Sequence, residues 1–224
     1  MMTVTEAVTA RYSARAFLDR PVPRAEIEDM LTLAARAPSG GNLQPWQVDV
    51  LAGEALADLK ARAAASLAAN PGGEGTEFPV YPPALGEPWR GRRFACGEQL
   101  YAALKIARED RPARLGQFAR NFQAFGAPVL LLFSLSRAFG PPQWAHLGMF
   151  MQNVMLLAAE RGLATCPQEA WAVVHKTVGE VLGPNEDRLF YCGMALGFAD
   201  EDHAINGWRT ERVPLENFAS FRGF

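Results

Sequence analysis

Helical spacing of apolar residues predicts a helix in several segments of this chain. Near the start, Thr3 and Glu6 have the spacing of a capping box, so a short helix should run to about Ala10. A helix over Arg24–Arg36 is predicted by the apolar stripe Ile27, Met30, Leu31, Ala34 and Ala35. Further helices are expected over Glu54–Ala69, Gly97–Glu109 and Val174–Leu182.

Three shorter segments have the pattern of β-strands. From Trp46 to Leu51, apolar and polar residues alternate, which is typical of a strand with one buried face. Pro128–Phe133 is apolar throughout, as in a central strand that is covered on both faces. The apolar run Leu189–Gly197 predicts one more strand.

The longest predicted helix runs from Gln143 to Arg161, with Gly162 in the position that commonly follows a helix. Its apolar residues cover nearly the whole circumference, and no Lys, Arg, Asp or Glu occurs between Gln143 and Ala159. A helix that is apolar on most of its faces is buried. We therefore expect this helix to be buried between two subunits.

The stretch Ala37–Trp46 joins a predicted helix to a predicted strand and is rich in polar groups. Pro38 should end the helix before it. Gly40 and Gly41 allow positive φ and the close approach of a ligand. A hydroxyl and two amides, which can bind donors and acceptors on a planar heterocycle, come from Ser39, Asn42 and Gln44. Taken alone, the stretch is also explained as a simple turn.

Two other segments have no periodic pattern. Asn70–Arg93 contains Pro, Gly and single aromatic residues, and a loop of this length is usually functional or mobile. We expect it to cover a pocket, with contacts from Phe78, Tyr81 and Trp89, although a plain surface loop explains it equally well. The C-terminal arm, residues 200–224, carries Arg209, Arg212 and several aromatic residues with little sign of packing on its own.

The composition is that of an ordinary globular protein, with 49% hydrophobic and 21% charged residues. The 224 residues are expected to form one domain, 1–224. The 22 basic and 24 acidic residues give a net charge of −2, so no nucleic-acid partner is indicated. The sequence has no targeting pattern and no apolar run of the roughly 20 residues needed to cross a membrane. Three cysteines without a C-x-x-C pair favour a reduced, cytoplasmic protein.

Several common catalytic motifs are absent from the sequence. It contains no G-x-G-x-x-G, no Walker A loop and no G-x-S-x-G. The histidines, His146, His175 and His203, are far apart and lack the H-E-x-x-H pattern, so no metal site is expected. Cys166 lies near His175 in the sequence, but no third residue that would orient a thiol nucleophile is apparent.

Basic and polar residues alternate in Arg11-Tyr12-Ser13-Ala14-Arg15. If this segment is extended, Arg11, Ser13 and Arg15 project to the same side. Two guanidinium groups and a hydroxyl suit a phosphate, because arginine can bind it through two hydrogen bonds at once. An exposed basic turn after the first helix would explain the same residues.

Four motifs, in order along most of the chain, resemble those of the FMN-dependent nitroreductase family. The first two are Arg11-x-Ser13-x-Arg15-x-Phe17 and Ala37-Pro38-Ser39-x-x-Asn42-x-Gln44-Pro45-Trp46. The third, which corresponds to the loop facing the flavin, is Gly162-Leu163-x-Thr165-Cys166-Pro167-Gln168-Glu169. The fourth, similar to the family's C-terminal signature, is Arg209-x-x-Arg212-Val213-Pro214-Leu215-Glu216. Lysines that some members place near the flavin ring have no clear counterpart.

The resemblance implies that these motifs bind FMN. The FMN phosphate would be held by Arg11, Ser13, Arg212 and Arg209, and Arg15 would reach the ribityl chain or the pyrimidine edge of the ring. The neighbouring subunit would line the cofactor with Pro38, Ser39, Gly40 and Asn42, and place Gln44 near the ribityl chain or ring edge. One face of the ring would be covered, and a backbone N–H offered to N5, by Pro167, Gln168 and Glu169.

The fold implied by the resemblance is α+β, a central mixed β-sheet wrapped by helices, in an intertwined homodimer with flavin sites at the interface. NAD(P)H would reduce FMN at N5 and leave before an electron-poor nitroaromatic or quinone takes its place. No side chain would be catalytic in the strict sense, because the flavin carries the hydride and solvent can supply protons.

Three alternatives remain open on the sequence alone. One is another flavin reaction on this scaffold: enone reduction, reductive dehalogenation or flavin fragmentation. The others are a non-catalytic FMN-binding storage or regulatory protein and a cofactor-free helical dimer. The physiological acceptor and the choice between NADH and NADPH are also left open.

Overall fold

The computed structural model describes residues 2–224, and its centre is a four-stranded β-sheet of order β1-β2-β4-β3. The strands are β1 (Gln47–Ala52), β2 (Val129–Ser136), β3 (Ala164–Gln168) and β4 (Arg188–Gly197). The three strand pairs are antiparallel, and an isolated bridge between Ser13 and Thr165 is parallel. The four strands thus form an antiparallel sheet, and the parallel pairing found in the described residues is this isolated bridge of Ser13, a residue outside the four strands.

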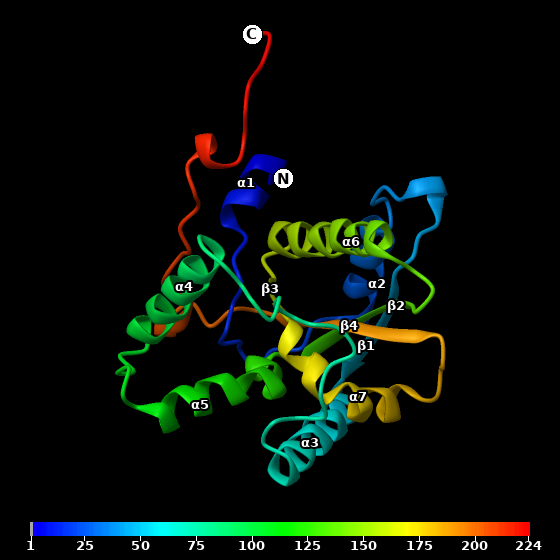
Figure 1. Cartoon of the computed structure of the whole chain (residues 1–224). Helices are drawn as coiled ribbons and strands as arrows, with labels where there is room; N and C mark the ends of the chain where they lie inside the picture. Colours follow the sequence, from blue (N-terminus) through cyan, green and yellow to red (C-terminus); the bar gives the residue numbers. More distant parts are fainter. Residues whose placement is uncertain (1) are drawn as a thin grey trace.

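Helices cover both faces of the sheet (Figure 1). One face packs against α2 (Arg24–Ala34) and α6 (Pro141–Glu160). The other packs against α3 (Gly53–Ala69) and α7 (His175–Leu182). This helix–sheet–helix arrangement confirms the α+β class expected from the sequence.

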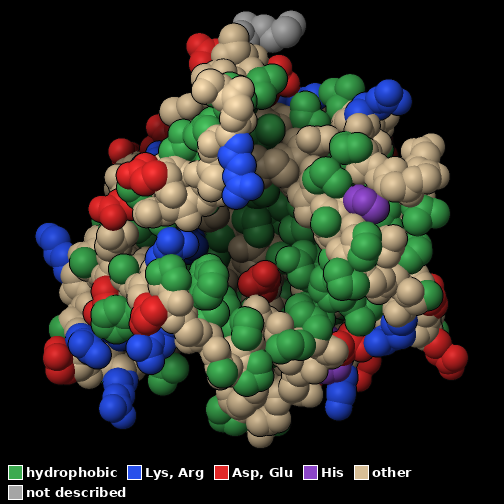
Figure 2. All heavy atoms as spheres, turned by 45° about the horizontal axis from the view of Figure 1, so that its top comes forward, with side chains coloured by type: hydrophobic (Ala, Val, Ile, Leu, Met, Phe, Trp, Pro, Cys, Tyr) green, Lys and Arg blue, Asp and Glu red, His purple; other side chains and the backbone are tan. Residues whose placement is uncertain are grey.

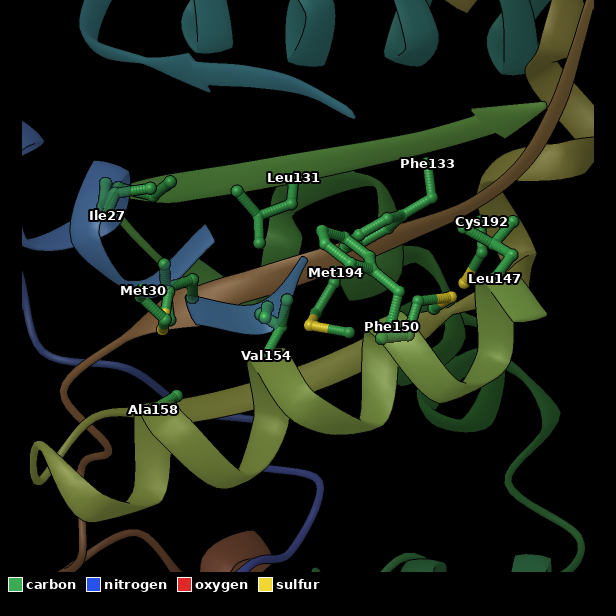
Figure 3. Packing of buried hydrophobic residues seen from close by; sticks show 14 of the residues in the cluster. Ile27, Met30, Leu131, Phe133, Leu147, Phe150, Val154, Ala158, Cys192 and Met194 are labelled. Carbon is green, nitrogen blue, oxygen red and sulfur yellow. The ribbon is translucent and has the colours of Figure 1, made fainter. Parts of the chain in front are cut away.

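The two faces of β2 contribute to two different hydrophobic cores. Leu131 and Phe133 belong to the core on the α6 side, where Phe133 contacts Phe150 edge to face at a ring separation of 6.2 Å (Figure 3). Leu130 and Leu132 belong to the core on the α3 side. Because side chains alternate between the faces of a strand, covering both faces requires an uninterrupted apolar run. The two-sided burial predicted for this strand is thus confirmed.

The helix α6 buries one stripe of residues against the sheet: Leu147, Phe150, Met151, Val154 and Ala158. The opposite side, including Met149, is exposed in the single chain. Gly162 follows the helix with φ +67°, the left-handed conformation that glycine adopts without strain. If α6 lies at a subunit interface, as we predicted, the second subunit would cover this apolar outer face.

The N-terminal helix α1 (Val4–Ala10) begins with the predicted capping box. The main-chain N–H of Thr3 donates to the Glu6 carboxylate at 2.6 Å, and that of Glu6 donates to the Thr3 hydroxyl at 3.2 Å. The short 3-10 helices are η1 (Gly40–Asn42), η2 (Arg120–Gly126), η3 (Glu169–Val174), η4 (Ala204–Asn206) and η5 (Leu215–Asn217). Among the described residues, no helix is long and apolar enough to cross a membrane.

The region after the non-periodic loop differs from the prediction. In place of a helix over Gly97–Glu109, the chain forms α4 (Trp89–Ala103) and α5 (Arg111–Ala119). Neither helix has a buried residue, and the large apolar residues of α5, Leu115 and Phe118, are exposed in the single chain. The two helices are joined by a bidentate ion pair, in which Arg114 donates to Glu98 at 2.6 and 3.1 Å.

The non-periodic loop is shorter than predicted, since α4 begins at Trp89, and its first part is anchored to α3 and α7. The main-chain N–H of Glu74 donates to the carbonyl of Val173 at 2.7 Å. The Glu74 carboxylate accepts hydrogen bonds from the main-chain N–H groups of Lys176 and Thr177 at the start of α7, and from the Ser66 hydroxyl of α3. This carboxylate therefore caps α7 and holds the loop against the domain.

The C-terminal arm extends away from the sheet and its helices (red in Figure 1). Four of its large apolar side chains are exposed: Leu215, Phe218, Phe221 and Phe224. Its first part is held firmly, because Ile205 and Asn206 are buried. The expectation that the arm packs little on its own is confirmed for the part after residue 214.

Candidate active site

A cavity of about 400 Å³ lies between the segment after α1 and the start of the C-terminal arm. Its walls combine basic, hydroxyl and aromatic side chains, among them Arg11, Tyr12, Ser13, Arg15, Trp208, Arg209 and Arg212. All five residues predicted to bind a phosphate or the adjoining chain of FMN thus line one cavity, although about 200 residues separate the two segments.

The first wall of this cavity is positioned by pairing with the edge of the sheet. Ser13 forms a parallel bridge with Thr165, and the N–H of Ala14 donates to the Thr165 carbonyl at 3.0 Å. The segment is therefore extended, as the alternation of its side chains required. Arg15 adds a hydrogen bond from its guanidinium to the Ser13 carbonyl at 3.1 Å.

Asn206 joins the two walls of the cavity. Its side-chain oxygen accepts from the N–H of Arg15 at 2.8 Å, and its amide nitrogen donates to the carbonyls of Ala16 and Asp200, also at 2.8 Å. The side chain is buried, with the residue only 4% exposed. A buried amide with all these partners fixes the arm beside the N-terminal segment.

The four arginines of the cavity have no carboxylate partner. Among residues 2–224, none of Arg11, Arg15, Arg209 and Arg212 takes part in an ion pair. Burial, and to a smaller extent the positive charge of Arg212, lowers the pKa of Arg11. Like charges held together at a partly buried site favour the binding of an anion. The cavity therefore fits the phosphate of FMN.

Arg209 and Arg212 are held differently. The Arg209 guanidinium donates to the carbonyls of Asn206 at 2.7 Å and Trp208 at 2.9 Å, and lies 3.8 Å from the centre of the Tyr12 ring. Arg212 bonds only to its own segment, at 2.6 Å to the Thr210 hydroxyl and 2.9 Å to the Glu211 carbonyl. Arg209 is thus fixed in place, whereas Arg212 can turn toward an anion by giving up local bonds.

The third motif lies at the end of β3, the strand that pairs with the Ser13 segment. Gln168 is only 2% exposed, and its amide donates to the Asn121 carbonyl at 2.8 Å and accepts from the Trp171 indole at 3.4 Å. Its side chain is therefore committed to the core, which leaves its backbone to meet a ligand. Pro167 and Glu169 on either side are half-buried.

The Pro38–Gln44 loop lies elsewhere in the single chain, beside α6, and none of its residues lines the arginine cavity. The N–H of Gly40 donates to His146 of α6 at 3.3 Å. Gly41, Asn42 and Gln44 all have positive φ, between 49° and 59°. Such a conformation in non-glycine residues costs energy and is common at functional sites. A role for Pro38, Ser39, Gly40, Asn42 and Gln44 at a flavin requires a second subunit.

The cavity includes residues that the motifs did not identify. Tyr12 and Trp208 line it, and Asn206 positions it. Tyr12 lies inside the first motif and could have been considered. The sequence, however, does not distinguish an aromatic residue that contacts a ligand from one that packs in the core. Asn206 gives no sequence signal, because its function depends on a pairing across 191 positions.

The cysteine considered as a nucleophile is unsuited to that function. Cys166 is buried, and burial raises the pKa of its thiol to about 11. The thiol is therefore protonated near neutral pH and is a weak nucleophile.

One face of the molecule is hollowed (Figure 2). In Figure 2 the hollow is walled mostly by hydrophobic side chains, with basic groups on one side and an acidic group at its floor. A planar apolar ligand with a charged end fits such a surface.

Comparison with known proteins identifies the family of this chain. Residues 8–198 match the model of the nitroreductase family. Among curated proteins, the chain is 36% identical over 218 residues to a chloronitrobenzene nitroreductase of Comamonas testosteroni, covering 97% of this chain and 96% of that protein. It is 35% identical over 220 residues to a 4-nitrobenzoate reductase of Pseudomonas putida, covering 97% and 94%.

Solved structures with the same fold include close relatives. An FMN- and NADPH-dependent nitroreductase NfnB from a sphigopyxis strain is 47% identical over all of both chains, with a TM-score of 0.97. The FMN-dependent NfnB of Mycobacterium smegmatis, solved with NADPH, is 29% identical over 98% of this chain and 97% of that one, with a TM-score of 0.93. From the family match over most of its length and these relatives, we conclude that the chain belongs to the nitroreductase family.

Proposed function

We propose that this protein is an FMN-dependent oxidoreductase that uses NAD(P)H to reduce nitroaromatic or quinone-type acceptors. The observation that carries the proposal is the cavity in which four arginines and Ser13 meet without a carboxylate partner among the described residues. The names of the relatives point the same way, since they reduce nitroaromatic compounds or depend on FMN and NADPH. The three free cysteines favour a reduced compartment such as the cytoplasm.

In this proposal the residues of the cavity bind and orient the cofactor. Arg11, Arg212 and Ser13 hold the phosphate, and Arg209 is kept beside them by Tyr12 and the Asn206 carbonyl. Arg15 lies further along the same strand-like segment and extends toward the ribityl chain or the ring. FMN, when bound, supplies the hydride chemistry that links NAD(P)H to the acceptor.

The ring would lie against the end of β3. Pro167 and Glu169 offer side chains to one face, and Gln168 offers its backbone, because its amide is used in the core. The Pro38–Gln44 loop of a second subunit would supply the remaining contacts, including Ser39, Gly40, Asn42 and Gln44. This requires a homodimer with the site at its interface, buried by the apolar outer face of α6 and the C-terminal arm.

An open face that admits one planar partner at a time makes donor and acceptor alternate. Steady-state rates with NAD(P)H and a nitroaromatic should then give parallel lines in double-reciprocal plots. The purified yellow protein should lose its colour when NAD(P)H is added without acceptor and regain it when the nitroaromatic is added. Intersecting lines, or a colour that NAD(P)H cannot remove, would contradict the proposal and favour a flavin-binding protein without turnover.

Binding of FMN and of riboflavin to the apoprotein tests the phosphate site separately. Removing one partner of a partly buried charge pair costs about 2–5 kcal/mol of binding free energy. Riboflavin lacks the phosphate, so it should bind roughly 30-fold to several-thousand-fold more weakly than FMN. Equal affinities would place the phosphate outside the arginine cavity.

A further inference from the structure

A second cavity, of about 390 Å³, lies beside the first residues of β4. Its walls come from α7, the turn after α7, the start of β4 and the segment that follows β2. β3, which adjoins the Ser13 segment, pairs instead with the second half of β4, Gly193–Gly197. The second cavity shares no lining residue with the arginine cavity or with Pro167–Glu169. FMN bound as proposed would therefore leave it open.

Arg188, the first residue of β4, brings a guanidinium group without a partner into this cavity. The residue is half-buried, and its Nε and Nη1 are shielded from solvent without a hydrogen bond. It takes part in no ion pair within residues 2–224. A shielded donor that has lost its water and gained no acceptor raises the free energy of the fold. An acceptor that enters the cavity would recover part of this cost.

The acidic residues around the cavity do not supply that acceptor. Glu77 of the loop before α4 pairs with Arg137, whose Nε also donates to the carbonyl of Glu186 at 2.9 Å. The carboxylate of Asp187, next to Arg188 in the chain, accepts from a hydroxyl of β2 at 2.7 Å. Glu186 itself is exposed and makes no ion pair in the described chain. The positive charge of Arg188 is thus left without a counter-charge.

Further groups at the start of α7 add to the basic character of the cavity. Lys176 lines it, is exposed and makes no ion pair with the described residues. His175 also lines it, and its Nδ1 is shielded without a hydrogen-bond partner. Three basic and two acidic side chains line the cavity, so one positive charge is in excess while His175 is neutral. Glu74 caps α7 but does not line the cavity. The cavity therefore favours an anion.

We propose that this cavity binds a small oxyanion, a phosphate or a carboxylate, with Arg188 as its main partner and Lys176 at the rim. Guanidinium groups bind such anions through short, charge-assisted hydrogen bonds. Because two nitrogens of Arg188 are shielded, the anion would meet the third, Nη2, first, and a turn of the side chain would then bring a second nitrogen to it. The inference does not depend on the proposed function, since it uses none of the residues assigned to FMN.

Anomalous diffraction locates the anion directly. Crystals of the FMN-loaded protein, whose arginine cavity is occupied, are soaked in selenate, a tetrahedral oxyanion with a strong selenium signal. We expect a selenium peak beside Arg188 in the wild type and none at that place in Arg188→Met. A wild-type crystal without a peak at Arg188 would overturn the proposal.

Urea unfolding in the presence of excess FMN measures the affinity in solution. A ligand that binds only the folded protein stabilises it increasingly as its concentration rises above Kd. Phosphate and, separately, acetate are raised at constant ionic strength. Phosphate also stabilises proteins because it is excluded from their surface, so a matched control is needed. Arg24→Met changes an exposed arginine that pairs with Glu28 on α2, at the opposite face of the sheet, and should respond as the wild type does.

Arg188→Met should bind the anion about 30-fold more weakly, or worse, because removing one partner of a shielded charge pair has an effect of that size. Equal responses of Arg188→Met and the wild type to both anions would contradict the proposed site. A selenium peak that has no counterpart in solution would also contradict it, since it would show binding at crystal concentration only.

The stability of Arg188→Met without added anion is a second readout. It should equal or exceed that of the wild type, because the substitution removes an unsatisfied donor and keeps the apolar part of the side chain. Lys176→Met, at an exposed position, should keep the fold and weaken binding by about two- to fivefold. A marked loss of stability in Arg188→Met would show that its guanidinium already has partners in the fold, and the proposal would then be wrong.

Discussion

At the scale of single residues, the arginine cavity stores an unfavourable interaction that a ligand would relieve. Arg11 lies partly buried beside Arg212, and the two positive charges have no carboxylate between them in the described chain. This repulsion therefore disfavours the ligand-free protein, and a bound anion would relieve it.

Arg11→Met tests this balance in both states. We expect FMN affinity to fall by roughly 30-fold to several-thousand-fold, because the phosphate loses a charge-assisted partner. Without FMN, the unfolding free energy should stay level or rise, since the repulsion from Arg212 is removed while the apolar contacts are kept. Fluorescence titration with FMN and urea unfolding of the apoprotein measure the two effects.

The control for Arg11→Met is Arg62→Met. Arg62 forms an exposed ion pair with Asp58 at 2.8 Å on α3, away from the cavity. Such a pair contributes little to stability, so neither FMN affinity nor unfolding should change appreciably. An apoprotein that Arg11→Met destabilises markedly would mean that Arg11 supports the fold.

A glycine in β4 makes room for the largest side chain of the core. A Cβ at Gly193 would lie 2.5 Å from Cδ1 of Trp171, which is fully buried. We expect Gly193→Ala to lower the unfolding free energy by about 1–3 kcal/mol, because the indole must shift within a packed core. Gly179→Ala in α7 meets no atom within 4 Å and should raise stability by about 0.5–1 kcal/mol. Chemical denaturation of both variants compares the two glycines.

At the scale of elements, the sequence predicted those helices and strands whose residues carry a local pattern of buried side chains or caps. The stripe of α2 follows from contacts that repeat at the helical period, the apolar run of β2 from burial on both faces, and the capping box of α1 from two residues three positions apart. The bounds of α4 were missed because it has no clear apolar side, and α5 was missed because its nine residues include only two large apolar ones, Leu115 and Phe118. The strand β3 was also missed, since its five residues include a proline and gain their burial from β4.

The candidate site was predictable in part for the same reason. Arg11, Ser13 and Arg15 alternate within one extended segment, so their common direction could be read from spacing. Asn206, by contrast, joins segments 191 positions apart, and the core role of the Gln168 amide depends on Asn121. Hydrogen-bond partners that are far apart in the sequence meet only in the folded chain, so no local sequence pattern predicts them.

The anchored start of the 70–88 loop should respond to acid. Burial acts to raise the pKa of Glu74, but hydrogen bonds from Thr177, Ser66 and Lys176 outweigh it, so the pKa lies below its ordinary value of 4.5. A group whose pKa is lowered by folding stabilises the protein at pH values above its pKa in the unfolded state. This stabilisation is lost as the pH falls through the pKa of the folded state. Glu74→Ala should therefore cost about 1.5–3 kcal/mol near neutral pH.

Urea unfolding at a series of pH values checks this prediction. The difference between the wild type and Glu74→Ala should shrink steadily as pH falls below about 4.5. The control Glu180→Ala removes an exposed carboxyl from α7, the helix that Glu74 caps, and should show a small difference. A difference for Glu74→Ala that is constant with pH would show that its hydrogen bonds do not depend on the charge.

At the scale of the whole molecule, the exposed apolar groups of the arm form surface that the proposed second subunit would cover. Leu215, Phe218, Phe221 and Phe224 extend beyond the body of the protein, and the outer face of α6 is also uncovered. Apolar surface of this extent on one molecule usually marks an interface. The same interface would bring the Pro38–Gln44 loop to the arginine cavity of the other chain.

Deleting residues 215–224 tests the function of the arm's apolar end separately from that of its arginines. The shortened protein keeps Arg209 and Arg212, and we expect it to dissociate at protein concentrations where the full chain is a dimer. Its FMN affinity should fall together with dimerisation, because half of each site would come from the partner. Light scattering and FMN titration over a range of concentrations measure this link. A full chain that is monomeric while holding FMN would contradict it.

The absence of buried residues in α4 and α5 has a consequence for amide hydrogen exchange. A helix that contributes nothing to a core can open without exposing that core, so its amides should exchange quickly, whereas those of β2 should exchange only through global unfolding. α4 faces the arm across a groove that Arg212 also lines. A ligand that immobilises Arg212 should therefore slow exchange in α4 and the arm strongly, and leave the much slower exchange of β2 to report the stability gained by the whole fold.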